Sequence, residues 1–136
     1  MQTVEQFFQH YTTAYINSDL DSFSRLISLP SMLLAGTNKT LLTDTLSLQN
    51  YILCRVSRYR ELGVATADFI LQHQLRLSEQ LQFASLYWRF YDALGKVLFT
   101  CHTSYTLQQQ QGQWQVVAII IDDEDAAFNR HQASQA

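Results

Sequence analysis

Residues 65–77 read ATADFILQHQLRL, and this stretch decides the fold class. Apolar and polar residues alternate along it. The apolar face consists of Ala65, Ala67, Phe69, Leu71, His73, Leu75 and Leu77. A period of two over this length is typical of a long β-strand with one buried face. Since the chain before it has helical spacing and the chain after it alternates again, helices should precede a sheet.

The N-terminal part of the chain is predicted to hold three helices. The first is expected over residues 4–17, where Thr3 and Gln6 form a capping box ahead of a wide aromatic stripe. The second is short, is capped by the polar residues 17–19, and carries apolar residues as far as Ile27. Both helices should pack an apolar side against the sheet.

Pro30 is expected to end the second helix, because proline disrupts helical hydrogen bonding. Residues 31–35 and 40–42 flank a turn and predict a short hairpin. A third helix should follow between the cap at residues 43–45 and Gly63, a residue type that commonly ends helices.

Three further strands are predicted after the first long one. They cover residues 82–91, 97–108 and 113–122, and tight turns separate them. Consecutive antiparallel strands joined in this way form a meander. The expected order is therefore helix, helix, short hairpin, helix and four long strands.

Composition excludes several classes of partner. With 136 residues the chain fits one domain, and a formal charge of −3 with a pI near 5.7 gives no electrostatic reason to expect nucleic acid or an anionic membrane. No apolar run approaches the ~20 residues of a membrane span, and the N-terminus lacks the pattern of a signal peptide. A cytoplasmic protein is expected, with Cys54 and Cys101 as reduced thiols.

The predicted order of elements resembles the NTF2-like superfamily, which includes ketosteroid isomerase, SnoaL-type polyketide cyclases, scytalone dehydratase and nuclear transport factor 2. The most familiar motifs are YDALGK at 91–96, TSYTL at 103–107 and GQWQV at 112–116. The resemblance implies an α+β fold with three N-terminal helices packed in the concave face of a strongly curved, mostly antiparallel sheet. One such domain would span residues 1–136, with a short tail from about 126. These motifs are fold signatures and do not assign a function.

The resemblance also implies a conical cavity, and strand alternation indicates which side chains would line it. Trp88, Thr103 and Tyr105 should point inward, and Tyr15 should lie at the open mouth. His73 falls on the apolar face of the first long strand. It is the one catalytic candidate, as a general base, although a lone histidine in such a place is more often a neutral core residue. These five residues form the predicted binding site for a small apolar or ring-containing metabolite.

Acidic residues are scarce where acid–base chemistry would need them. Asp68 should face outward, Asp92 lies in a turn, and Asp122 stands at a strand end. The missing inward carboxylate argues against a ketosteroid isomerase mechanism and leaves open whether the protein is an enzyme. The acidic run 122–125 could bind a hard cation, but acids of this kind more often begin a helix. No metal or cofactor is expected.

The last strand is apolar on both faces over residues 116–121, a pattern typical of a strand covered on both sides. The helices cover one face, and a second copy of the chain would cover the other. The outward residues Tyr87, Arg89, Tyr91 and His102 suit such a homodimer interface. The alternative function is therefore a non-catalytic dimerisation or adaptor module of NTF2-like fold.

Overall fold

The computed structural model describes residues 2–123 and 129–130, and its helices pack on one side of a six-stranded sheet. The strand order is β2–β1–β6–β5–β4–β3, and every neighbouring pair is antiparallel except β1 with β6. The elements are α1 Val4–Ile16, α2 Leu20–Arg25, β1 Ile27–Ala35, β2 Asn38–Leu42, α3 Thr45–Glu61, β3 Thr66–Arg76, β4 Leu81–Tyr91, β5 Val97–Gln110 and β6 Gln113–Ile121. The predicted α+β class, with its hairpin and four-stranded meander, is confirmed.

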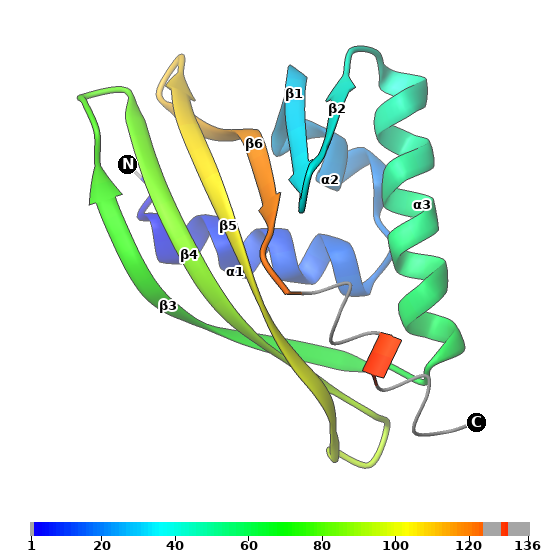
Figure 1. Ribbon diagram of the computed structural model, residues 1–136. Coiled ribbons are helices and arrows are strands. Elements are labelled where there is room, and N and C mark those ends of the chain that lie inside the picture. Colours follow the sequence, from blue (N-terminus) through cyan, green and yellow to red (C-terminus); the bar gives the residue numbers. More distant parts are fainter. Residues whose placement is uncertain (1, 124–128, 131–136) are drawn as a thin grey trace.

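Figure 1 shows the curved sheet from its outer side, with α1 crossing behind it and α3 standing beside β2. The core fills the space between these helices and the inner face of the sheet. Alternate residues of β4 supply one wall of it, and all four are buried: Ala84, Leu86, Trp88 and Phe90. The aromatic stripe of α1 supplies the other wall, where the Phe8 ring centroid lies 4.8 Å from that of Tyr105.

Two hydrogen-bonded caps fix where the long helices begin. The Thr3 hydroxyl accepts the Gln6 N–H at the start of α1, and the Gln6 side chain accepts the Thr3 N–H in return. Asp44 caps α3 by accepting the N–H of Ser47, at 2.8 Å. That bond, aided by the Ser47 hydroxyl, lowers the pKa of Asp44. The capping box predicted at Thr3 is confirmed.

The second helix is shorter than predicted. It ends at Arg25, and Ile27 already belongs to β1, where it pairs with Val116 of β6. Pro30 therefore lies inside a strand. The pairing with β6 is interrupted between Ile27 and Met32, and proline is tolerated at such an irregularity because it donates no ladder hydrogen bond.

A β-bulge in β3 reverses which face its side chains occupy. Leu71 pairs with Leu86, but His73 pairs with Ser85, so Gln72 is an extra residue. Beyond the bulge, His73 shares the outer face with Ser85 and is exposed. The prediction that His73 points inward is wrong, because strict alternation does not continue through the bulge.

A second irregularity explains part of the apolar run in β6. Val116 pairs with Leu107 and Ala118 with Thr106, which leaves Val117 as the extra residue. Val116 on one side of this shift and Ile119 on the other are therefore both buried in the core. The extra residue changes which positions of β6 face the core, and this explains part of the apolar run 116–121. The apolar side chains on the outer face explain the rest.

Within the part of the chain that the structure describes, no helix has the length and apolarity needed to span a membrane. The tail predicted from residue 126 lies outside the described residues apart from Asn129 and Arg130.

Candidate functional site

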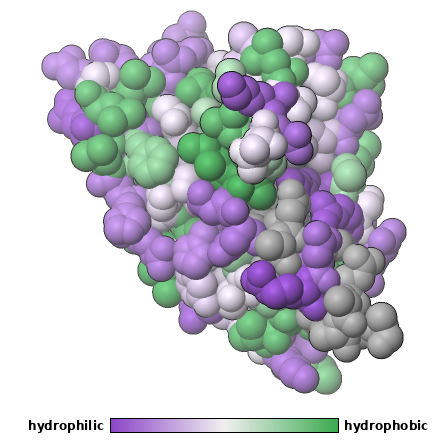
Figure 2. Space-filling view, in the orientation of Figure 1, coloured by the Kyte–Doolittle hydropathy of each residue, from purple (hydrophilic) through white to green (hydrophobic). Residues whose placement is uncertain are grey.

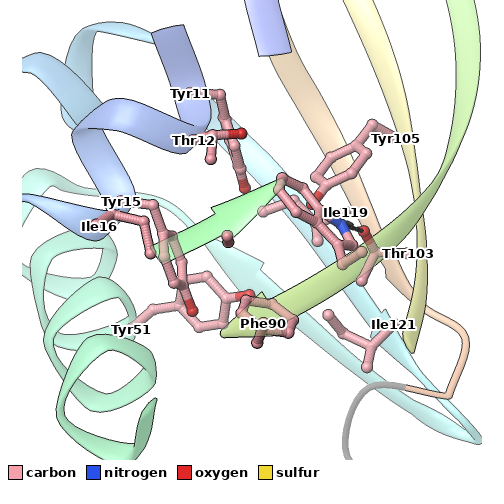
Figure 3. Close-up of a pocket in the computed structure, with 12 residues that line it drawn as sticks. Tyr11, Thr12, Tyr15, Ile16, Tyr51, Phe90, Thr103, Tyr105, Ile119 and Ile121 are labelled. Carbon is pink, nitrogen blue, oxygen red and sulfur yellow. Dashed lines mark hydrogen bonds between the residues drawn. The ribbon is translucent and has the colours of Figure 1, made fainter. Parts of the chain in front are cut away.

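A narrow apolar cleft lies between α1, α3 and the inner face of the sheet (Figure 3). Its walls are mostly aromatic and aliphatic: Tyr11, Thr12, Tyr15, Ile16, Tyr51, Ala67, Trp88, Phe90, Thr103, Tyr105, Ile119 and Ile121. The cavity volume is about 20 Å³, which is room for one or two water molecules. Side chains therefore fill most of the cleft.

A chain of three hydrogen-bonding side chains crosses the sheet side of the cleft. The indole N–H of Trp88 donates to the Thr103 hydroxyl at 2.7 Å, and that hydroxyl donates to the Tyr105 oxygen at 2.9 Å. All three residues are buried, with exposures of 6%, 1% and 3%. Because the Tyr105 oxygen accepts the Thr103 proton, its own phenol proton is directed elsewhere as a donor. The cleft thus has an ordered polar strip in an otherwise apolar wall.

Two tyrosines from different helices line the cleft on the side away from the hydrogen-bonded strip. In Figure 3, Tyr15 of α1 and Tyr51 of α3 lie on the same side, opposite Thr103 and Tyr105. The Tyr15 ring also contacts Phe23 at 5.5 Å between centroids. The guanidinium of Arg55, a residue only 8% exposed, lies 5.5 Å from the Tyr51 ring centroid. These contacts help to position both tyrosine rings in the wall of the cleft.

Among residues 2–123 and 129–130, none of those that line the cleft is a histidine or a carboxylate. The strand carboxylate Asp68, which follows the lining residue Ala67 in sequence, faces outward and is hydrogen-bonded by Arg89 at 2.8 Å and by Tyr91 at 2.9 Å. The Asp68 carboxylate raises the pKa of Arg89, and burial followed by the bond to Asp68 raises that of Tyr91. The polar groups of the cleft are therefore hydroxyls and one indole, which suit hydrogen bonding more than proton transfer.

The fold agrees with comparisons to known families. A family model described as NTF2-like protein (DUF6841) matches residues 2–124. The chain belongs to this NTF2-like family. No curated protein matches it.

Solved structures share the NTF2-like fold at low sequence identity. Aln2 from a Streptomyces species has a TM-score of 0.71 and 20% identity, over 90% of this chain and 89% of that one. An NTF-2 like protein of unknown function from Shewanella oneidensis gives 0.65 and 13%, over 85% and 92%. A ketosteroid isomerase-like protein from Erwinia carotovora atroseptica gives 0.64 and 15%, over 86% and 90%. At these identities the likeness extends to the fold alone.

The NTF2-like cleft contains four of the five residues that the sequence predicts for a binding site. Tyr15, Trp88, Thr103 and Tyr105 all line it, whereas His73 lies on the opposite face of the sheet. The predicted set lacked the other lining residues from the helices, Tyr11, Thr12, Ile16 and Tyr51. It also lacked four lining residues from the sheet: Ala67, Phe90, Ile119 and Ile121. The spacing of Tyr11 with Tyr15, four residues apart on one helix face, was a usable signal.

The residues predicted for a dimer interface lie on the outer face, where each already has a partner in its own chain. Arg89 and Tyr91 bind Asp68, as described above. The Tyr87 and His102 rings lie 5.0 Å apart, and His102 Nδ1 lies 2.9 Å from a carboxylate oxygen of Asp123. These contacts organise the outer face without showing what covers it.

An apolar patch lies beside these residues on the outer face. It comprises residues that strand pairing places together: Met32, Leu34, Leu41, Ala118 and Ile120. Met32 is 41% exposed and Leu41 55%. Figure 2 shows hydrophobic side chains gathered over this part of the face, above a more polar area. We call this set the outer-face patch.

No metal centre is formed by the described residues. No three histidine, cysteine, aspartate or glutamate side chains among them are grouped as ligands. Asp122 instead accepts a hydrogen bond from Ser104, and Asp123 lies against His102. Glu124 and Asp125, the rest of the acidic run, lie outside the described residues.

Proposed function

We propose that this NTF2-like chain, a single domain over residues 1–136, binds a small apolar molecule with a ring system in the cleft. The observation that supports this most strongly is the chain of Trp88, Thr103 and Tyr105. An apolar pocket with a few converging polar groups is the usual form of a small-molecule site. Buried polar side chains are costly unless they are hydrogen-bonded, and these bond one another along the wall of the cleft.

Binding requires the cleft to open. Its volume of about 20 Å³ is far below the ~300 Å³ at the lower end of ordinary ligand sites. Tyr15 and Tyr51 are half-buried and line the cleft, so rotation of these two side chains is the change that would admit a ring. The ligand must supply the free energy for this opening, which lowers its apparent affinity.

The cleft supports binding better than acid–base catalysis. A general base must lie within hydrogen-bonding reach of the proton that it removes. The lining residues that the structure describes include no histidine or carboxylate, and His73 lies on the outer face. The likeness to the ketosteroid isomerase-like protein from Erwinia is one of fold, and we carry no acid–base chemistry over to this chain.

The test is titration with N-phenylnaphthylamine, an uncharged aromatic probe whose fluorescence rises in apolar surroundings. We expect saturable binding of one probe per chain. Tyr51→Ala should bind several-fold more tightly because one closing side chain is removed. Leu53→Ala is the matched control, since Leu53 is an exposed residue of the same helix.

Tyr15→Ala provides an independent check, because it opens the cleft from α1 and leaves the contact of Arg55 with Tyr51 intact. It should also tighten binding. If the wild type and both alanine variants give no saturable signal, the proposed binding function is wrong.

A second candidate function is homodimerisation through the outer face, and the outer-face patch is the observation that favours it. Exposed apolar groups that cluster on a sheet are typical of a contact surface. The patch continues toward Tyr87 and His102, which would join it in the interface. A second copy would cover the apolar side chains that the helices leave exposed.

Light scattering coupled to size-exclusion chromatography tests this interface. The wild type should have the mass of two chains, and Met32→Lys combined with Leu41→Lys should have the mass of one. Leu94→Lys is the control, since Leu94 is 94% exposed at the β4–β5 turn. A wild-type monomer in dilute solution would contradict the dimer.

A further inference from the structure

The cleft shares lining residues with two hollows on the surface, and only one of them is large. A groove between α1 and the edge strand β3 has a volume of about 310 Å³. It is lined by Glu5, Gln9, Thr12, Thr13, Ala67, Asp68 and Phe69. The second hollow, on the α3 side, has a volume of about 10 Å³. We call the large one the β3 groove.

Small side chains separate the β3 groove from the cleft. Thr12 and Ala67 line both hollows, one from α1 and one from β3. The Thr12 hydroxyl donates to the carbonyl of Phe8 at 2.7 Å, which ties this side chain to its own helix. On the α3 side the shared residues are the bulky Tyr15 and Ile16. A route from the cleft to the surface between Thr12 and Ala67 would therefore displace less side-chain bulk than one past Tyr15 and Ile16. We call the route between Thr12 and Ala67 the passage.

The β3 groove carries one uncompensated negative charge. Of its two carboxylates, Asp68 is paired with Arg89 at 2.8 Å. Glu5 is exposed and forms no ion pair with any other described residue. Gln9, which lies between Glu5 and the passage along α1, and Thr13, just beyond Thr12, are polar and uncharged. The groove thus favours a positively charged group at the end that holds Glu5.

We infer that the ligand is an aromatic or alicyclic ring compound with a flexible tail that ends in an amine. This inference rests on the proposed binding function. The ring occupies the cleft, the tail passes between Thr12 and Ala67, and the ammonium group reaches Glu5. Thr12 and Glu5 are seven residues apart on α1, which is about 10 Å along the helix axis. An aminopentyl chain is long enough to cover most of that distance.

Two probes, one with a charged tail and one with a neutral tail, test this inference. Dansylcadaverine carries a fluorescent ring on an aminopentyl tail, and its N-acetyl derivative has the same ring and tail without the charge. At low salt the wild type should bind the amine up to about fivefold more tightly, since exposed ion pairs are worth no more than that. The preference for the amine should disappear in Glu5→Gln. It should also disappear for the wild type in 0.5 M salt, because the Debye length is then only about 4 Å and the exposed charges are screened. Glu61→Gln, at the far end of α3, should retain it.

Blocking the passage should weaken the binding of both dansyl probes by a similar factor. Ala67→Trp places a large ring in the passage. Ala67→Leu is a smaller substitution that is used if the tryptophan variant does not fold. Circular dichroism establishes folding before either titration.

The outcomes separate this inference from the function on which it rests. If both dansyl probes bind equally and Glu5→Gln changes neither, the amine tail is wrong while the cleft remains a binding site. If neither dansyl probe nor N-phenylnaphthylamine binds, the proposed function fails and the amine-bearing ligand fails with it. A charge preference that Glu61→Gln removes as well would also overturn the assignment to Glu5.

Discussion

Thr103→Val tests the hydrogen-bond chain that gives the cleft its polar strip. Valine has nearly the shape of threonine, so the variant removes the hydroxyl without opening a cavity. The buried indole N–H of Trp88 then loses the acceptor that lies 2.7 Å away. A buried donor left without a partner costs about 1–3 kcal/mol. The free energy of unfolding should therefore fall by that amount.

Urea denaturation followed by circular dichroism measures this change. With an m-value of about 2 kcal/mol/M, the midpoint should fall by roughly 0.5–1.5 M while m stays constant. Thr106→Val is the matched control, since Thr106 is a half-buried threonine of the same strand that faces the other side of the sheet. It should change the free energy of unfolding by less than about 0.5 kcal/mol.

A double-mutant cycle with Trp88→Phe isolates the bond itself. In the phenylalanine background no N–H remains to be satisfied, so Thr103→Val should cost at least about 1 kcal/mol less than in the wild type. Equal costs in the two backgrounds, or an unchanged Thr103→Val protein, would refute the reasoning that this hydroxyl satisfies Trp88.

Three further predictions follow from the fold. Leu86→Ala, on the fully buried inner face of β4, should lower the free energy of unfolding by about 2–5 kcal/mol in urea, whereas Ile70→Ala on the exposed side should cost less than 1 kcal/mol. His73→Ala should change neither the free energy of unfolding nor the binding of N-phenylnaphthylamine. A loss of binding would contradict the placement of His73 outside the binding site. The lowered pKa of Asp44 means that its stabilising charge is complete above the unfolded value of about 3.9 and is lost as pH falls through the folded value. The melting temperature of Asp44→Asn should therefore fall less steeply than that of the wild type between pH 5 and pH 2, and equal slopes would contradict this.

Local signals predicted most of the architecture because they are written in short stretches of sequence. The capping box at Thr3 and the cap at Asp44 need only a few neighbouring residues, and both form. Alternation along β4 and β5 continues through the middle of both strands, so it placed Trp88, Thr103 and Tyr105 on the inner face correctly. Where the pattern is uninterrupted, it determines the face.

The failures occur where tertiary pairing overrides the local pattern. Gln72 looks like any polar residue of an alternating strand, and only its mismatch with β4 makes it a bulge that moves His73 outward. Ile27 has helical spacing, yet pairing with Val116 draws it into β1. Arg55 carries a charge, yet it is buried against Tyr51 of the same helix. None of these three outcomes follows from neighbouring residues alone.

How far the cleft is closed also depends on long-range packing. The sequence indicates an apolar inner face but not the distance between α1 and α3, which sets how much space Tyr15 and Tyr51 leave. The resemblance to NTF2-like proteins implied a cavity, and the structure has one of only about 20 Å³. The proposed opening of the cleft is therefore the step on which the binding function depends.

The two tryptophan indole N–H signals in a ¹H–¹⁵N NMR spectrum test that step most directly. Trp88 lines the cleft, whereas Trp114 does not and donates instead to the carbonyl of Gln2 at 3.2 Å. Trp88→Phe and Trp114→Phe assign the two signals. Titration with N-phenylnaphthylamine should shift the Trp88 signal to a plateau and leave the Trp114 signal in place. If neither signal moves at saturating probe, or if only that of Trp114 moves, the cleft is not the binding site.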